Sequence, residues 1–220
     1  MSAPGWPAEL SEGPVRLRPL RRRDARAWCE LRRRNAAWLT PWESTLPFTS
    51  YVSVDAANRA TYRGMLRMLR RQARAGVGLP FAIDYDGRLA GQVTVSSIVR
   101  GSLHSASVGY WVDEAVAGHG VAPTAVALVV DHCFSAVGLH RVELNVRPEN
   151  TRSRRVAEKL GFREEGVRLR YLHIDRDWRD HLCFALTVEE VPGGLLRRYR
   201  RTNQPGDTPS RLRTDEQRGR

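Results

Sequence analysis

The chain has 220 residues, of which 41% are hydrophobic and 27% are charged. This balance fits one globular domain with its own core, and it excludes a chain that is disordered throughout, a collagen-like repeat or a small disulfide scaffold. The three cysteines lie far apart, and the longest nearly apolar stretch is about half as long as a membrane span requires. The first residues lack the pattern of a secretory signal, so we expect a cytoplasmic protein with reduced thiols and no membrane contact.

The chain is strongly basic, with 36 Lys and Arg residues against 24 Asp and Glu residues and a net charge of +12. Such a surface attracts RNA, a ribosome or an anionic cofactor without distinguishing among them. Composition predicts a flexible leader at residues 1–13, a folded domain at 14–191 and a basic, disordered tail at 192–220. Four arginines of that tail offer either a contact to rRNA or merely a solvated surface: Arg197, Arg198, Arg200 and Arg201.

The first third of the domain is predicted to hold one strand and two helices. Alternating apolar and polar residues predict a strand at 15–20, and helical spacing predicts a helix at 24–35. Residues 38–54 contain several aromatic residues without a period, which indicates a loop. Asp55 is a candidate cap for a second helix that reaches about residue 75.

The rest of the domain is predicted to alternate strands and helices. Strands at 79–85 and 89–99 are joined by Asp86-Gly87, a strong hairpin signal, and a third strand follows at 105–112. The remaining elements are a helix at about 121–137, a strand at 140–146, a helix at 150–160 and two closing strands at 162–174 and 178–188. The resulting order, β-α-α-β-β-β-α-β-α-β-β, predicts an α/β domain with one central sheet.

Residues 108–122, VGYWVDEAVAGHGVA, predict a strand, a glycine-containing loop and a helix start. Free backbone N–H groups at that helix start would form an anion site, and Gly118 and Gly120 would allow positive φ and close approach to a pyrophosphate. An ordinary loop with two glycines is the alternative for this segment alone. The segment lacks the G-K-[ST] of a Walker A loop and the third glycine of the dinucleotide fingerprint.

A second segment, RVELNVRPENTRS at 141–153 followed by EKLGF at 158–162, changes the interpretation. Together the two segments resemble the GCN5-related N-acetyltransferase (GNAT) superfamily, over roughly residues 15–191. The resemblance implies an α/β GNAT fold: a single domain with a mixed, mostly antiparallel sheet of about seven strands flanked by four helices. It also implies that acetyl-CoA is the acyl donor.

The same resemblance assigns the residues that would contact acetyl-CoA, with three departures from the family pattern. Ala115 replaces the usual Gln or Arg of the loop, Ala157 replaces a tyrosine acid, and Asn145 replaces a glutamate used by some relatives. The cofactor-binding residues implied by the resemblance are Val112, Ala117, Gly118, His119, Gly120, Val121, Ala122, Asn150 and Ser153.

Narrower motifs resemble the ribosomal-protein-alanine N-acetyltransferases of the RimJ/RimL type. These motifs are LTPW at 39–42, LHRVE at 139–143, RPEN-x-x-S at 147–153 and WRDH at 178–181. The resemblance implies acetylation of a protein N-terminal amine, with a ribosomal protein as the favoured partner. We expect direct attack in a ternary complex, with a monomer or homodimer as the enzyme. Two alternatives stay open: a small-molecule amine as the acceptor, or a non-catalytic RNA- or ribosome-binding module on the same fold.

The reaction requires a proton acceptor for the amine, a hydrogen bond to the thioester carbonyl and a proton donor for the leaving thiolate. Ser153 is our candidate donor, and a backbone N–H near Val112 is the candidate for the carbonyl. Glu143 is our candidate base, on the same strand face as Asn145. Glu143 could instead pair with an arginine, in which case a water relay, or the weaker candidates Glu114 and Glu149, would take the proton.

The acceptor groove is expected at the aromatic-rich loop. Trp38, Trp42 and Tyr51 could line it, although loop aromatics also commonly pin a loop to the core. The histidines show no ligand spacing such as H-x-x-x-H, so we expect no metal.

Overall fold

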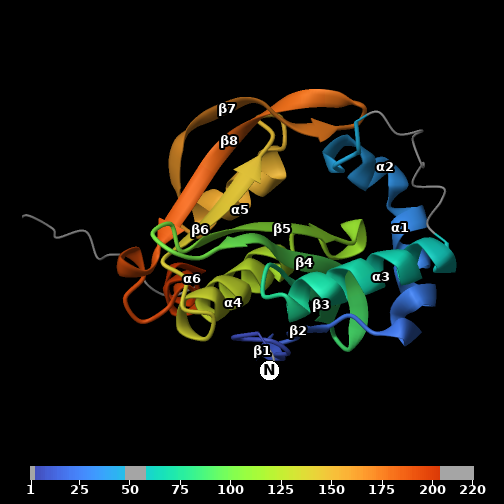
Figure 1. Ribbon diagram of the computed structural model, residues 1–220, viewed down its shortest axis with the longest axis horizontal. Helices are drawn as coiled ribbons and strands as arrows, with labels where there is room; N and C mark the ends of the chain where they lie inside the picture. The colour runs from blue at the N-terminus through green and yellow to red at the C-terminus, as the bar shows by residue number, and fades with distance from the viewer. Residues whose placement is uncertain (1–2, 48–57, 204–220) are drawn as a thin grey trace, which may run out of the picture.

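The computed structural model describes residues 3–47 and 58–203. One sheet runs through the molecule in the order β1-β2-β3-β4-β5-β6-β8-β7 (Figure 1). Its strands are β1 (Leu10–Glu12), β2 (Val15–Pro19), β3 (Leu79–Tyr85), β4 (Arg88–Val99), β5 (Ser105–Val112), β6 (Arg141–Val146), β7 (Arg163–Ile174) and β8 (Asp177–Thr187). The helices are α1 (Ala25–Arg34), α2 (Ala36–Leu39), α3 (Arg59–Arg74), α4 (Val121–Ser135), α5 (Thr151–Lys159) and α6 (Leu195–Asn203). Short 3₁₀ turns include η2 (Thr40–Trp42) and η4 (Glu114–Val116).

Every neighbouring pair of strands is antiparallel except β5 and β6. These two strands pair in parallel only where Ser105–Ser107 face Arg141–Glu143. Beyond that point they diverge, and β6 rises away from β5 toward the β7–β8 hairpin (Figure 1). The sheet is therefore split between the carboxyl-terminal halves of β5 and β6.

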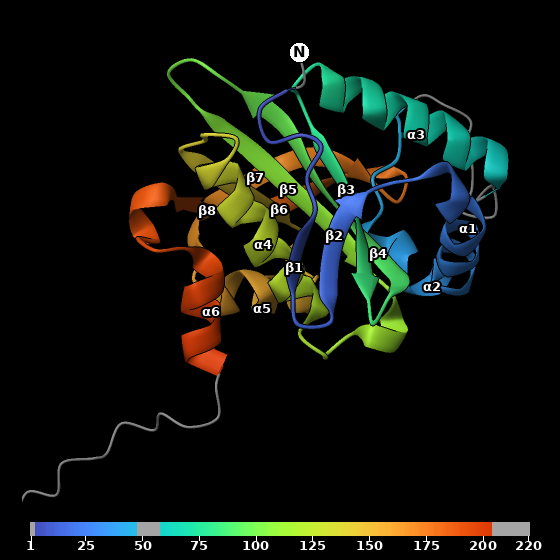
Figure 2. The same cartoon turned by 90° about the horizontal axis from the view of Figure 1, so that it is seen from below.

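The core consists of two clusters that lie on opposite faces of the sheet. The larger cluster joins the strands to α4, whose residues Val126, Val129 and Val130 are fully buried. The smaller cluster joins α1 and α3 through Trp28, Tyr62 and neighbouring side chains. Figure 2 shows α1, α2 and α3 at one side of the molecule and α4, α5 and α6 at the other.

Strand β5 contributes to both clusters because its side chains alternate between the two faces. Val108, Tyr110 and Val112 pack with the α4 cluster, whereas Trp111 packs against the α1–α3 cluster. At the split, the two faces of the sheet are therefore lined by different residues of the same strand, β5.

The expected α/β architecture with a single mixed, mostly antiparallel sheet is confirmed, and the described residues form eight strands instead of about seven and six helices instead of four. The prediction of a flexible leader is wrong for Leu10–Glu12, which form β1 against β2. Upstream of β1, Trp6 packs edge-on against Phe81 at 5.2 Å, and His132 Nε2 donates to the Gly5 carbonyl at 2.7 Å. These contacts order a segment whose Pro- and Gly-rich composition indicated a loose chain.

The prediction of a disordered tail is wrong for its first part, which forms α6. The Asp131 carboxylate accepts hydrogen bonds from the backbone N–H groups of Leu195 and Leu196, at 2.6 and 3.0 Å, and so caps the helix. Leu195 is fully buried, and Arg198 donates to the Leu160 carbonyl. Residues 204–220 lie outside the described part of the chain.

The aromatic-rich segment predicted as a loop begins with α2 and η2. The next helix, α3, is capped by Asn58, whose side chain accepts from the N–H groups of Ala60 and Thr61; Asp55, the predicted cap, lies outside the described residues. Within the described ranges, no helix has the length and apolar content needed to cross a membrane.

Candidate active site

A cavity of about 1010 Å³ lies where β5 and β6 separate. Its loop side is lined by Val112, by residues of the 113–120 loop, by the start of α4 and by α5. Its tryptophan side is lined by Trp28, Arg32, Trp38, Trp42, Glu43 and Trp111. Because β5 supplies Tyr110 to one face and Trp111 to the other, one continuous cavity reaches both faces of the sheet.

The loop side has the backbone geometry of an anion site. Gly118 and Gly120 have φ of +87° and +77°, which confirms the predicted positive φ. Gly120 precedes α4 and supplies no side-chain cap, so the N–H groups at the start of this 15-residue helix keep their donor capacity. Ala117, Gly118, Gly120, Val121 and Ala122 line the cavity, while the His119 side chain is exposed and does not.

The loop is held in place by α1. The Asn35 amide group donates to Asp113 Oδ1 at 2.9 Å, and its carbonyl oxygen accepts from the Glu114 N–H at 2.9 Å. Arg34 pairs with the other oxygen of Asp113. Arg34 and Asn35 together keep the pKa of the Asp113 carboxyl below its ordinary value, against the effect of burial.

Helix α5 adds a capped start and positive charge to the loop side. Asn150 Oδ1 accepts from the Ser153 N–H at 3.0 Å, which makes Asn150 the N-cap. Both residues, for which the family resemblance implies a contact with the donor, line the cavity. Three basic side chains of α5 also line it, and their charge suits an anionic ligand: Arg152, Arg155 and Lys159.

Tyr110 is a residue of this side that the sequence analysis missed. Its hydroxyl is buried and makes no hydrogen bond with the described residues. Burial raises the pKa of Tyr110 to about 12, while the neighbouring Ser153 hydroxyl acts in the opposite direction. The phenol therefore stays protonated at neutral pH, beside the residue that we expected to be the proton donor. Strand alternation in VGYWV, which places Tyr110 with Val108 and Val112, was the available signal.

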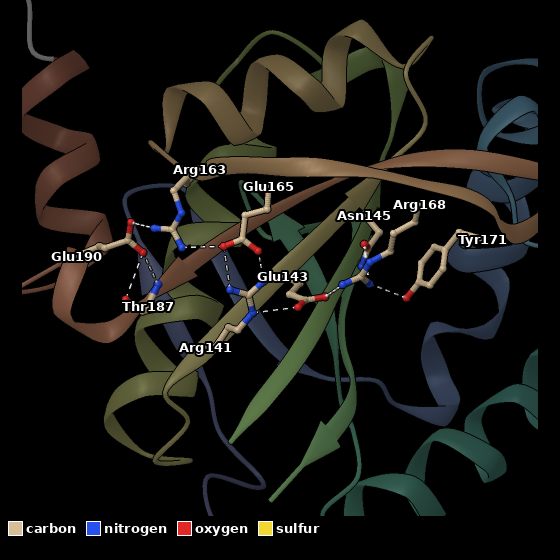
Figure 3. A network of polar contacts seen from close by, with 9 residues as sticks. All are labelled: Arg141, Glu143, Asn145, Arg163, Glu165, Arg168, Tyr171, Thr187 and Glu190. Atoms are coloured by element: carbon tan, nitrogen blue, oxygen red, sulfur yellow. Dashed lines mark hydrogen bonds and ion pairs between the residues drawn. The ribbon is translucent and has the colours of Figure 1, made fainter. Parts of the chain in front are cut away.

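Glu143 and Asn145 belong to a polar network between β6 and β7 (Figure 3). Glu143 Oε1 accepts from Arg141 Nε at 2.9 Å, and Glu143 Oε2 accepts from Arg168 Nη2 at 2.9 Å. Arg168 also donates to Asn145 Oδ1 at 3.1 Å and to the Tyr171 hydroxyl at 3.1 Å. Asn145 lines the cavity, whereas Glu143 does not.

This geometry argues against Glu143 as the base, because guanidinium groups occupy both of its oxygens and it lies away from the cavity. The alternative that Glu143 pairs with arginine is the one observed. Glu165, Arg163 and Glu190 continue the network, which joins β6 to β7 and to the end of β8 (Figure 3).

Trp38 and Trp42 line the cavity and are also pinned by arginines. Trp38 Nε1 donates to the Val112 carbonyl at 3.2 Å, and the Arg152 guanidinium lies 4.3 Å from its ring centroid. The Arg147 guanidinium lies 5.4 Å from the ring of Trp42. The two functions that we considered alternatives, lining a groove and fixing a loop, therefore occur together. Tyr51 lies outside the described residues.

An Arg–Glu pair on the tryptophan side was also missed. Arg32 is 6% exposed, and its guanidinium lies 5.6 Å from the ring of Trp28 and 5.3 Å from that of Trp111. It pairs with Glu43 Oε1, while Glu43 Oε2 is buried and makes no hydrogen bond with the described residues. Glu43 directly follows the LTPW motif, but its pairing depends on a residue 11 positions away.

His181, from the WRDH motif, completes the cavity wall near β8. Its Nδ1–H donates to the Arg179 carbonyl at 3.0 Å, and burial lowers the pKa of its imidazole. All three cysteines are buried outside the cavity lining, and burial raises the pKa of Cys133 to about 12. In the described residues, no group of three His, Cys, Asp or Glu side chains could hold a metal ion.

Residues 15–163 match the family described as Acetyltransferase (GNAT) domain. Among solved structures, RimJ of Mycobacterium smegmatis in complex with CoA-disulfide is 43% identical at a TM-score of 0.86, covering 91% of this chain and 97% of that one. The ribosomal protein uS5-alanine N-acetyltransferase of Escherichia coli (strain K12) is 30% identical over 172 residues, which are 78% of this chain and 87% of that protein.

A shorter match joins the chain to the Bacillus subtilis protein named "Probable N-acetyltransferase YjcK", at 44% identity over 101 residues. That match covers 46% of this chain and 56% of YjcK. The family match spans more than half of the chain and confirms the resemblance that the two central motifs indicated. The chain belongs to the GNAT acetyltransferase family, and it is an acetyltransferase that uses acetyl-CoA as its acyl donor.

Proposed function

We propose that the protein transfers the acetyl group of acetyl-CoA to the N-terminal amine of a ribosomal protein. The observation that carries the proposal is the single cavity that reaches both faces of the split sheet. A donor bound on one face and an acceptor bound on the other can meet in the split without a covalent enzyme intermediate. The burial of all three cysteines outside the cavity is consistent with this direct transfer.

Acetyl-CoA is assigned to the loop side. The uncapped start of α4 suits a pyrophosphate, since backbone N–H groups and the helix dipole both favour negative charge there. These donors are backbone amides, so Ala115 in place of the usual Gln or Arg does not remove them. Arg155 and Lys159 of α5 add positive charge along the same wall.

The leaving thiolate needs a proton, and Ser153 is our proposed donor. Tyr110 supports this role because its protonated phenol lies beside Ser153 and has no other partner among the described residues. A phenol from β5 would thus serve where family members carry a tyrosine on the last helix, at the position of Ala157. Ala157 itself is fully buried in the core.

The acceptor is assigned to the tryptophan side. The acceptor of one relative, the uS5-alanine N-acetyltransferase of Escherichia coli, supports a ribosomal-protein N-terminus. Trp38 and Trp42 offer flat apolar walls to an extended peptide end, and Arg32 and Arg147 give this side positive charge. That charge disfavours polycationic small amines as acceptors.

The test is an acetylation assay with purified protein, acetyl-CoA and synthetic peptides of ribosomal-protein N-termini, read by mass spectrometry. We expect transfer to the free N-terminus of a uS5 peptide and none to the same peptide with a blocked N-terminus. Spermidine and an internal-lysine peptide are the comparison acceptors. Preferred acetylation of either one would contradict the proposed acceptor class.

A further inference from the structure

Among the described residues, four buried side-chain atoms lack a hydrogen-bond partner, and two of them belong to residues that line the cavity. These two are the Tyr110 hydroxyl on the loop side and Glu43 Oε2 on the tryptophan side. A buried carboxylate oxygen without a partner is costly, because it has given up its water hydrogen bonds. Such an atom in a substrate cavity indicates a group that the ligand completes.

The Glu43 carboxylate is held in one orientation by Arg32. The Arg32 guanidinium is itself fixed, since it lies over the rings of Trp28 and Trp111 and the residue is almost fully buried. It occupies Glu43 Oε1 and leaves Oε2 available. The backbone around Glu43 is fixed as well, because the Glu43 carbonyl accepts from the Asp175 N–H at 3.3 Å and Ser44 bridges to Ile174 of β7.

We propose that Glu43 is the proton acceptor for the incoming amine, with Arg32 as its positioning residue. Glu43 Oε2 receives the ammonium group of the acceptor and takes one proton from it. This inference rests on the proposed function in that it assigns the acceptor to the tryptophan side. It replaces Glu143, whose oxygens are both occupied outside the cavity.

The proton balance is complete with groups already named. The acceptor arrives as an ammonium ion and loses one proton to Glu43, which later releases it to water. The freed lone pair forms the new N–C bond as the C–S bond breaks, and the second amine proton replaces the one that Ser153 gives to the thiolate. The products are the acetylated amine, the free thiol and one proton in solution.

The charged environment of Glu43 is defined by the elements packed around it. Arg32 on α1 contacts the carboxylate directly. Arg147, which follows β6, donates to the Pro41 carbonyl at 2.7 Å, and His173 on β7 contacts Thr45 at 2.7 Å. Other charged or titratable groups line other parts of the same cavity or belong to the adjoining β7–β8 turn: Glu114, Asp175, Arg176, Asp177 and His181.

The test is the Glu43→Gln variant, which keeps the shape of the side chain and its contact with Arg32 but removes the basic oxygen. We expect kcat/KM at pH 6.5 to fall about 10²-fold, the usual contribution of general-base catalysis. The loss should shrink steeply above pH of about 8, where an α-amine is already neutral. The Kd of acetyl-CoA, measured by calorimetry, should not change.

Glu30→Gln is the matched control, because Glu30 is also paired with an arginine on α1 but is exposed outside the cavity. A folded Glu43→Gln variant whose pH–rate profile runs parallel to that of the wild type would overturn the proposal. If Glu43→Gln fails to fold, Glu43→Asp keeps the charge and withdraws it from the acceptor. Full activity of Glu43→Asp at every pH would then be the contradicting result, and a loss confined to low pH the supporting one.

The acceptor in this experiment is whichever amine the wild-type protein acetylates. If that amine is spermidine and no peptide reacts, the proposed function fails while the role of Glu43 is still tested on spermidine. If a peptide reacts and Glu43→Gln keeps the wild-type pH profile, only the role of Glu43 fails.

Discussion

The two sides of the cavity are built from different kinds of atoms. The loop side presents mainly backbone groups from the 113–122 stretch, shaped by Gly118 and Gly120 and followed by an uncapped helix. The tryptophan side presents side chains from several distant segments, in which Arg32 lies over Trp28 and Trp111. Backbone recognition suits a donor that never varies, whereas side-chain recognition can be changed one residue at a time. We therefore expect the acceptor preference to depend on the tryptophan side.

The largest effect should come from Gly120→Trp, which places a large side chain beside the backbone N–H groups at the start of α4. Gly120 has a φ of +77°, its Cβ position lies 3.5 Å from the Tyr199 hydroxyl and the residue lines the cavity, so a bulky side chain there is both strained and crowded. We expect the Kd of acetyl-CoA to rise more than about 10²-fold in calorimetry, because several charge-assisted hydrogen bonds would be lost. Gly101→Trp, at a φ of +74° in open space in the β4–β5 turn, is the matched control. If both variants weakened acetyl-CoA binding equally, backbone strain alone would explain the effect.

The next effect should come from Tyr110→Phe, which keeps the ring and removes the hydroxyl. We expect kcat to fall about 10- to 10²-fold, as for loss of a proton donor, with the Kd of acetyl-CoA unchanged. Adding Ser153→Ala should cost little more than either change alone, since the two hydroxyls would act on one proton. Tyr85→Phe is the control, because Tyr85 is also half-buried against the larger core cluster but lies outside the cavity. An unchanged kcat for Tyr110→Phe would remove the phenol from the reaction.

Two arginine variants should distinguish the acceptor side of the cavity from the donor side, because each should change the KM of a different substrate. Arg147→Gln removes the stacking on Trp42 and weakens the bond to the Pro41 carbonyl, so the acceptor KM should rise about 5- to 10-fold, as expected from about 1 kcal/mol of lost contact. Arg155→Gln should instead raise the KM of acetyl-CoA, because Arg155 lies on the loop side. Steady-state kinetics with each substrate varied in turn provides the measurement. If both variants change the same KM, the assignment of the two sides is wrong.

The smallest effect, on the free energy of unfolding, is expected from Glu165→Gln in the polar network that joins β6 to β7. Arg141 and Arg163 lower the pKa of Glu165 to about 2, from an ordinary value of 4.5. A lowered carboxyl pKa contributes stability that is complete above pH 4.5 and is lost as the pH falls toward 2. Glu165→Gln should therefore reduce the free energy of unfolding by less than about 1 kcal/mol at pH 7, since the pair is partly exposed.

The difference between Glu165→Gln and the wild type should disappear near the lower end of that pH range. Denaturant unfolding at several pH values measures it, and Glu164→Gln, at the exposed neighbouring position, is the control. A constant difference at all pH values would show that the side chain acts through packing and not through its charge.

Most of the fold could be predicted, because the hydrophobic periods of the elements are local. The hairpin at Asp86-Gly87 and the boundaries of α1 and α5 were predicted to within about two residues. The wrong predictions of a flexible leader and of a disordered first part of the tail have one cause. Leu10–Glu12 and Leu195–Asn203 have few apolar residues of their own, and each is ordered by partners from elsewhere in the chain, β2 for the first and Asp131 for the second.

The sequence by itself predicted the family, the positive φ of the glycine loop before α4 and the start of the helix near Asn150, since glycine conformation and helix boundaries depend on a few neighbouring residues. Only the tertiary structure decided which carboxylate oxygens are paired with arginine. Glu143 lost its predicted role because Arg168, 25 positions away, folds back onto it. We propose that role for Glu43 because the arginine that orients it lies over Trp111, 79 positions further along the chain than Arg32. Which charge is paired and which oxygen stays free depends on long-range packing, and no local pattern encodes it.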